Sequence, residues 1–172
     1  MRILLSRTDR IGDLILSTPA IATIRASFPD ARIAIVTSAY NCAAVERNPN
    51  LDAVHAIPIG ARPSTFAAAF RDKVDLAIAL APRVADFEVV GATRAPKRLG
   101  YTYVRRYFAR LTWRMHLTEL ALSQADPGLV DRDPRRPVQH EVDQLLDLVA
   151  RAGARRRIED LRIDINDRDR AA

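Results

Sequence analysis

The chain has a single cysteine, Cys42, among its 172 residues. One thiol can form neither an internal disulfide nor a thiolate metal cluster, so a small disulfide-stapled secreted fold is excluded. No apolar run approaches the roughly 18 consecutive residues that suggest a membrane span. The N-terminal stretch carries early charges and does not resemble a signal peptide. These absences predict a soluble cytoplasmic protein.

Glycine is also scarce, and its spacing is informative. The six glycines are never paired as in G-x-G-x-x-G, and no G-K-[ST] follows a glycine-rich loop. A plain NAD dehydrogenase or P-loop NTPase is therefore disfavoured. The three histidines, His55, His116 and His140, are scattered without the spacing of a metal site. We therefore expect no metal ligand set and no resident cofactor, and we expect the histidines to be structural or solvated.

What the chain has in excess is positive charge. Lysine and arginine number 27 against 21 acidic residues, which leaves a net charge of +6. This balance suggests an anionic partner, which could be nucleic acid, a phosphorylated substrate or a membrane surface. An arginine-rich composition inherited from a GC-biased genome is an alternative cause. Hydrophobic residues make up 48% of the chain, enough for one domain with a real core.

Strand-like and helix-like segments alternate along the first hundred residues. Short apolar runs predict strands at 2–6, 32–37, 53–59, 74–80 and 97–102. Helical patterns occupy 13–27, 39–47, 64–72, 83–92 and 138–154, with Ser64 a candidate N-cap and 103–122 a further helix. Residues 123–137 are rich in proline and aspartate and suggest a loop. The alternation predicts an α/β fold, a Rossmann-like three-layer parallel sheet.

The loop at 7–13, within "RTDRIGDLILSTP", is the sharpest local feature. Ligands of such sheets bind beyond the carboxyl ends of the strands, where this loop would lie. Gly12 permits a tight turn and a close ligand approach. Asp13 is either a helix N-cap or a general base, and the residues alone favour the cap. A helix end lowers a carboxyl pKa and weakens the base, unless burial raises the pKa again.

Pro19 leaves two possible geometries for the segment after this loop. Within one long helix it would remove a backbone hydrogen bond and kink the helix. Alternatively, Thr18 is an N-cap with Pro19 at the first helical position, and residues 13–17 form a separate turn.

The stretches "ILLSRTDRIGDLILSTPAIATIRASFPDARIAIVTS", "VERNPNLDAVHAIP" and "RLGY" resemble the bacterial ADP-heptose:lipopolysaccharide heptosyltransferases, glycosyltransferase family nine. The resemblance spans about residues 1–165. It implies a GT-B architecture, in which the N-terminal of two Rossmann-like domains binds the acceptor and the C-terminal domain binds the nucleotide sugar. Transfer in that family inverts the anomeric centre without a metal. Asp13 matches the aspartate proposed to deprotonate the acceptor hydroxyl.

The resemblance also gives the basic residues a partner, because inner-core lipopolysaccharide carries carboxylates and phosphates that arginine can grip. A solvated basic face is the alternative explanation for them. The candidate acceptor-binding residues are Arg10, Gly12, Arg62, Lys97, Arg98, Arg105 and Arg106.

The expected domain layout is an acceptor-binding domain at 1–154 and an interdomain linker or tail at 155–172, with the donor-binding domain absent. On this interpretation the chain is a fragment, a natural truncation or half of a two-chain enzyme, and it is inactive alone. It would bind an anionic lipopolysaccharide-core acceptor, take a nucleotide-sugar donor only with a second domain, and contact the inner face of the inner membrane. A basic module that binds nucleic acid or another polyanion, and a non-catalytic remnant, are the alternatives.

Overall fold

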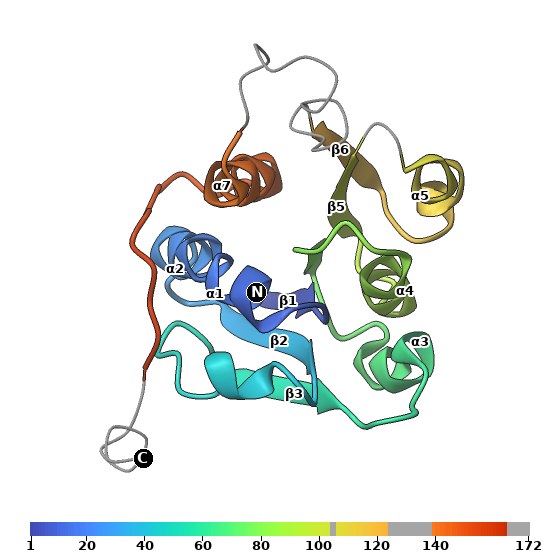
Figure 1. Ribbon diagram of the computed structural model, residues 1–172, viewed down its shortest axis with the longest axis horizontal. Helices are drawn as coiled ribbons and strands as arrows, with labels where there is room; N and C mark the ends of the chain where they lie inside the picture. The colour runs from blue at the N-terminus through green and yellow to red at the C-terminus, as the bar shows by residue number, and fades with distance from the viewer. Residues whose placement is uncertain (104–105, 124–138, 165–172) are drawn as a thin grey trace.

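The computed structural model describes residues 1–103, 106–123 and 139–164, and within them the strands form one parallel sheet (Figure 1). The sheet has six strands in the order β3-β2-β1-β4-β5-β6. They are β1 (Arg2–Arg7), β2 (Arg32–Ser38), β3 (Ala53–Ile57), β4 (Leu76–Ala79), β5 (Lys97–Tyr103) and β6 (Glu119–Ser123). The predicted α/β class with a Rossmann-like parallel sheet is confirmed.

Helices cover both faces of this sheet (Figure 1). One face carries α1 (Ile11–Ile15), α2 (Thr18–Ser27) and α7 (Glu141–Ala152), and the other carries α3 (Pro63–Ala67), α4 (Val84–Ala92) and α5 (Tyr107–Thr112). Short 3₁₀ turns lie at η1 (Cys42–Ala44), η2 (Ala68–Phe70) and η3 (Trp113–Met115). Each face has its own apolar cluster, one built on α2 and α7 and the other on α4. The result is the predicted three-layer arrangement.

The central strands carry uninterrupted apolar runs, at 3–5 in β1, at 33–36 in β2 and along all of β4, because both of their faces are covered. Leu5 of β1 pairs with Ile35 of β2 on one side and with Ile78 of β4 on the other. All three side chains are completely buried. Burying each is worth roughly 1.5–3 kcal/mol relative to leaving it exposed.

The chain reverses its direction of travel across the sheet between β1 and β4. It first adds β2 and β3 on one side of β1, and then β4, β5 and β6 on the other. The loops that follow β1 and β4 therefore begin side by side at the carboxyl edge. In open parallel sheets this reversal opens a crevice that binds ligands. The loop 7–13 lies at this point, as its sequence position predicted.

The segment 13–27 is two helices instead of one. A short helix, α1, ends at Ile15, and α2 then starts at Thr18 with Ser17 at its N-cap position. Pro19 falls in the first turn of α2, where its missing N–H leaves no hydrogen bond unmade. The expected alternative, a separate turn before a helix that begins near Pro19, is confirmed, with the cap one residue earlier than Thr18.

Other boundaries differ from the prediction. Residues 39–47 contain only the 3₁₀ turn η1. Helix α3 starts at Pro63, so Ser64 lies inside its first turn and Arg62 takes the cap position. The predicted helix 103–122 ends early, and its last part is β6, which pairs with β5. Pairing along an open sheet edge outweighed the local helical pattern there. Of the predicted loop 123–137, all but the first residue lies outside the described residues.

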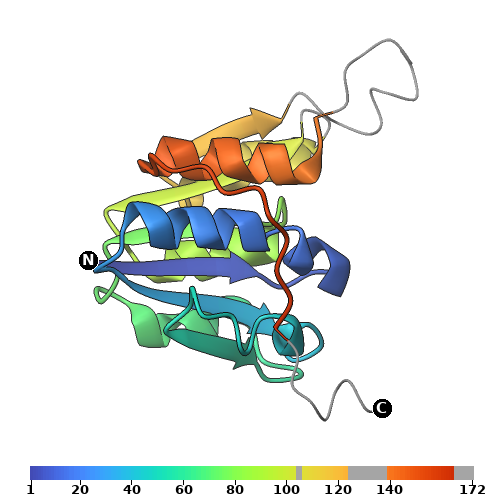
Figure 2. The same ribbon diagram turned by 90° about the vertical axis from the view of Figure 1, so that its left-hand side faces the viewer.

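The C-terminal part of the described chain returns along α2. Helix α7 ends at Gly153, whose φ of 107° is the left-handed conformation that favours glycine. Backbone N–H groups of residues 155–164 then donate to the hydroxyls of Ser27, Thr23 and Thr18. Figure 2 shows this segment passing over α2 toward the carboxyl ends of the strands. The division at residue 155 between a domain and a linker stays a prediction.

Candidate functional site

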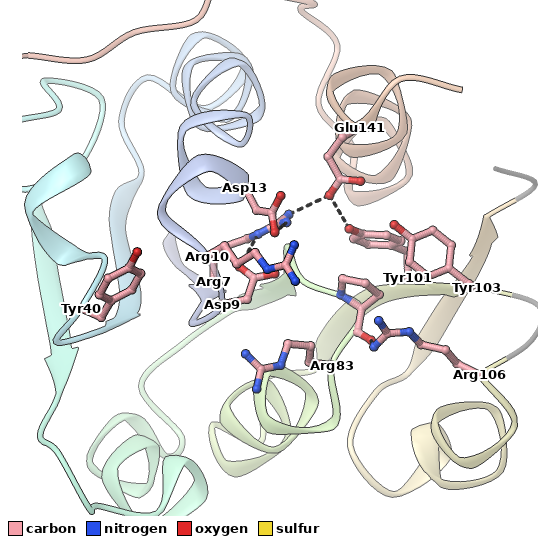
Figure 3. Close-up of a pocket in the computed structure, with 11 residues that line it drawn as sticks. Arg7, Asp9, Arg10, Asp13, Tyr40, Arg83, Tyr101, Tyr103, Arg106 and Glu141 are labelled. Carbon is pink, nitrogen blue, oxygen red and sulfur yellow. Dashed lines mark hydrogen bonds and ion pairs between the residues drawn. The ribbon is translucent and has the colours of Figure 1, made fainter. Parts of the chain in front are cut away.

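A cleft of about 640 Å³ opens at the carboxyl edge of the sheet, beside the reversal between β1 and β4 (Figure 3). We call it the main cleft. Loops after β1, β2 and β4, the end of β5, and the first turn of α7 supply its walls. The residues that line it are Arg7, Asp9, Arg10, Asp13, Tyr40, Pro82, Arg83, Tyr101, Tyr103, Arg106 and Glu141.

Arg7 is the buried charge at the centre of this site. Its Nε donates to Asp9 Oδ1 at 2.9 Å, its Nη1 donates to Glu141 Oε1 at 3.0 Å, and Nη1 also reaches the carbonyl of Leu80. Burial opposes its charge, yet Tyr101, Asp9 and Glu141 hold the pKa of Arg7 above its ordinary value. Arg7 thus serves as a fixed cation that orders the surrounding acidic groups.

Glu141 connects this cation to the far end of the described chain. Its Oε1 also accepts a hydrogen bond from the hydroxyl of Tyr101 at 2.6 Å. Burial raises the pKa of Tyr101, so this hydroxyl stays protonated and acts as a donor. The carboxylate occupies the first turn of α7, where a negative charge also favours the helix. Sequence reasoning missed Glu141 and Tyr101, because nothing local distinguishes Glu141 from an ordinary acidic residue at a helix start.

Asp13 lies in the first turn of α1, on the wall of the main cleft, with 37% of its side chain exposed. Its Oδ2 is 3.7 Å from Nη2 of Arg7, a loose ion pair. Burial raises the pKa of the Asp13 carboxyl, Arg7 opposes that shift, and Asp9 adds to it. A raised pKa makes a carboxylate a better base, provided that it remains ionised at the working pH.

One expectation about this loop was wrong. Asp13 is not an N-cap, because Arg10 occupies the cap position of α1 and no side chain caps that helix end. Of the two effects weighed for the pKa of Asp13, lowering by the helix end and raising by burial, burial is the one that prevails. With the cap interpretation removed, the carboxylate is left facing the cleft.

Gly12 does not make a turn that requires glycine. It is an exposed residue within α1, and its φ is not in the positive region. A Cβ added at Gly12 would meet no atom within 4 Å. The tight-turn argument is therefore wrong, while the open space beside Gly12 leaves its backbone approachable from solvent.

Three exposed arginines line the main cleft together with Asp13 and are the groups best placed to hold an anion. Arg10 and Arg83 form no hydrogen bond or ion pair within the part of the chain that the structure describes. Arg106 donates to the carbonyl of Pro82 at 2.9 Å, and its guanidinium lies 5.6 Å from the centre of the Tyr103 ring. Arg10 and Arg106 were predicted site residues, whereas Arg83 was missed because it follows β4 without any motif.

The remaining basic candidates do not line the main cleft. Lys97 and Arg98 begin β5, so they lie at the amino edge of the sheet, opposite the cleft. Lys97 Nζ donates to the carbonyl of Arg151 at 2.9 Å, and Arg98 Nε donates to that of His116 at 2.8 Å. Neither residue therefore lines the main cleft with Asp13, and their assignment as acceptor-binding residues stays a prediction. Arg62 is exposed at the start of α3 and outside the cleft lining, and Arg105 lies outside the described residues.

A second hollow, the side groove, extends the main cleft toward β3. It has a volume of about 550 Å³, and Tyr40 and Arg83 line both spaces. Ile57, Pro58 and Ile59 supply much of its surface. A ligand with a charged part beside Asp13 could therefore lay a less polar part along this groove.

Within the described residues, no group of three or more His, Cys, Asp or Glu side chains is arranged to share a metal ion. No helix of this part of the chain combines the length and apolar composition that crossing a membrane requires. His140 has a structural role, since its Nδ1 accepts the N–H of Val142 at the start of α7.

No protein-family model matches the sequence, and no curated protein matches it. Solved structures do match the fold. The chain is similar to a glycosyl transferase of family 9 from Veillonella parvula, with a TM-score of 0.75 and 21% identity over 99% of this chain and 46% of that one. It is similar to E. coli ADP-heptose lps heptosyltransferase II, with a TM-score of 0.67 and 18% identity over 99% of this chain and 49% of that one.

A third similar structure is an E. coli heptosyltransferase with ADP, with a TM-score of 0.66 and 17% identity over 94% of this chain and 49% of that one. The chain spans about half the length of each of these three structures. The expected fold is confirmed: the chain is a Rossmann-like domain similar in fold to about one half of each of these glycosyltransferases.

Proposed function

We propose that this chain is the N-terminal, acceptor-binding half of an inverting, metal-independent glycosyltransferase that adds heptose from ADP-heptose to the lipopolysaccharide core. The observation that carries the proposal is the Asp13 carboxylate, set in a cleft at the sheet reversal among Arg10, Arg83 and Arg106. Similarity in fold to two E. coli heptosyltransferases supports the choice of reaction.

In the proposed reaction, Asp13 accepts the proton of an acceptor hydroxyl. The acceptor oxygen then attacks the anomeric carbon of the donor sugar from the side opposite the diphosphate, which leaves as ADP. Burial that raises the pKa of Asp13 suits this role, because a stronger base lowers the barrier to proton transfer. Arg7 and Glu141 hold the loop but have no direct part in the chemistry.

Arg10, Arg83 and Arg106 recognise the acceptor in this proposal. Phosphate and carboxylate groups of the lipopolysaccharide core match the planar fork of arginine, which forms paired charge-assisted hydrogen bonds. Transfer also needs groups that bind the nucleotide sugar, which a second domain supplies. We therefore expect the chain to bind its acceptor alone but to transfer sugar only with that second domain, at the cytoplasmic face of the inner membrane.

Acceptor binding can be tested on the chain as it stands. Calorimetric titration with a delipidated, anionic core oligosaccharide should show binding that Arg10→Ala, Arg83→Ala and Arg106→Ala each weaken roughly ten- to hundredfold, because each removes a charge-assisted contact worth roughly 1.5–3 kcal/mol. Arg71→Ala is the matched control, since Arg71 is exposed just before β4, at the amino edge.

Three outcomes would contradict the proposal. Equal loss of affinity in the Arg71 variant would indicate general charge attraction instead of a site. Binding of RNA or DNA with a steep salt dependence, and none of the oligosaccharide, would favour the polyanion-binding alternative. Failure to bind either would favour a remnant without function.

A further inference from the structure

Helix α5 and the turn η3 present apolar side chains to solvent on their outer side. Tyr107, Leu111 and Met115 recur at four-residue spacing with Phe108 beside them, and each is at least 69% exposed. We call these four residues the α5 stripe. On the inner side, Ala109 is buried against the core of that face. A surface helix normally shows the reverse pattern, with apolar residues inside and polar residues outside.

Arginines border this stripe. Arg106, Arg110 and Arg114 follow the same four-residue spacing from the N-cap of α5 into η3, all three are exposed, and we call them the row of arginines. No acidic residue occurs between Glu88 and Glu119, which leaves the whole segment positively charged. An apolar stripe that bears tyrosine and phenylalanine and is flanked by arginines is the pattern of a helix that lies in a membrane interface.

The stripe is also continuous with the main cleft. A hollow of about 460 Å³ is lined by Tyr107, Phe108, Ala109 and Val84, and it shares Pro82 and Arg106 with the cleft. Figure 1 shows α5 at the end of the helical layer that also holds α3 and α4, beside β5 and β6. A helix lying in a bilayer there would bring the mouth of the cleft close to the lipid surface.

We propose that the α5 stripe and its row of arginines form a docking surface for an anionic phospholipid bilayer. The apolar side chains enter the boundary between headgroups and acyl chains, and the arginines pair with lipid phosphates. Charge complementarity selects this occupant over a second copy of the chain, because two copies meeting through α5 would bring their rows of arginines together. The docking itself does not depend on the transferase proposal, and only the benefit of a nearby lipid-linked acceptor rests on it.

The test is cosedimentation of the full 172-residue chain with vesicles of phosphatidylcholine alone or mixed with phosphatidylglycerol. We expect binding to the anionic vesicles, little to the neutral ones, and weakening as salt rises. Phe108→Ser and Leu111→Ser should each lower partitioning roughly tenfold, because each removes an apolar side chain that the bilayer would bury. Arg114→Ser should lower it about fivefold through the loss of one charge near the surface.

Two control variants match these changes on the opposite face of the sheet. Leu161→Ser removes a half-exposed leucine and Arg155→Ser an exposed arginine from the segment that lies along α2, and neither should alter binding. Trp113, the single tryptophan, is half-buried in η3 and gives a local readout. Its emission should shift to shorter wavelength with anionic vesicles and stay unchanged with neutral ones.

The docking proposal fails if anionic vesicles do not bind the chain, or if the α5 variants bind as well as the controls. It also fails if sedimentation shows that the chain is a dimer and that Phe108→Ser and Leu111→Ser convert it to a monomer, since the stripe would then be a contact between copies. Vesicle binding requires neither an acceptor nor a donor, so this result and that of the oligosaccharide titration can fail separately.

Discussion

Arg7 and Glu141 stand 134 positions apart in the chain, yet their side chains meet at 3.0 Å in the wall of the main cleft. This contact joins the end of β1, where the catalytic loop of the proposed enzyme begins, to the first turn of α7. The same glutamate oxygen also accepts from Tyr101, so three elements converge on one carboxylate. The position of Asp13 is therefore set by residues far from its own loop.

Breaking this ion pair should destabilise the fold according to which partner is removed. Arg7→Met would leave Asp9 and Glu141 partly buried without their cation and should lower the free energy of unfolding by about 3–5 kcal/mol. Glu141→Gln keeps an oxygen that can accept from Arg7 and Tyr101, so its loss should be about 1–2 kcal/mol. Urea denaturation of both variants checks the order, and equal losses would contradict it.

Local sequence patterns predicted the elements whose formation depends on residues close together in the chain. The apolar runs around Leu5 and Ile35 predicted buried parallel strands, because strands covered on both faces need apolar residues throughout. Strand β6 was missed because its structure depends on pairing with β5, about twenty residues earlier in the chain.

The residues of the main cleft likewise divide into those that the local sequence predicted and those that it did not. Asp13 and Arg10 stand in one short loop and were found from its sequence. Glu141 lies in the cleft because the fold brings the first turn of α7 beside the end of β1, and no local sequence pattern indicates this position. Lys97 and Arg98 lie outside the main cleft for a related reason: a basic residue near a strand lines the cleft only if it follows the strand, and both precede most of β5.

Asp86 should make the stability of the chain depend on pH. This carboxyl is fully buried and accepts hydrogen bonds from Ser6 Oγ at 2.7 Å and from the N–H and hydroxyl of Thr8 at 3.0 Å. Burial raises the pKa of Asp86 to about 6. The native state therefore holds this proton more tightly than the unfolded chain, where the pKa is near 3.8. The contribution of Asp86 to stability is full below pH 3.8 and is lost as the pH rises to about 6.

The loss over that interval should be about 3 kcal/mol, by the usual conversion of a pKa difference into free energy. Asp86→Asn should abolish this slope, because the amide oxygen can still accept from Ser6 and from the N–H of Thr8 while carrying no charge. Unfolding by urea between pH 4 and 7 measures the difference between the two proteins. If both lose stability in parallel over this range, Asp86 is not the group responsible.

Gly12→Ala separates a structural role of this glycine from a role in binding. The added Cβ meets no atom within 4 Å, and the residue lies in a helix. The variant should therefore unfold at the same free energy as the parent or up to about 1 kcal/mol higher. If the acceptor approaches this backbone closely, its affinity should nevertheless fall severalfold in calorimetric titration. A marked loss of stability would show instead that Gly12 is needed by the fold.

Asp13→Asn should separate acceptor binding from transfer. The amide keeps the size of the side chain but cannot take a proton, so binding of the oligosaccharide should stay within about twofold of the parent. With a donor-binding half supplied by fusion to that of a similar heptosyltransferase, the rate of transfer should fall by about 10²- to 10⁴-fold, the usual contribution of a general base. Transfer at an unchanged rate would remove Asp13 from the mechanism.

Glu141→Gln should lower the pKa of the Asp13 carboxyl by removing a negative charge that acts on it. The negative charge of Glu141 helps to raise the pKa of the Asp13 carboxyl, whereas Arg7 lowers it. Removing the Glu141 charge leaves the effect of Arg7 less opposed, so Asp13 should ionise at lower pH than in the parent. A carboxyl ¹³C titration followed by NMR, with Asp13→Asn to assign the resonance, measures this shift. In the fused enzyme the acidic limb of the pH–rate profile should move in the same direction, because the base must be ionised to act. An unchanged titration of Asp13 would mean that Glu141 supports the cleft only as a structural partner of Arg7.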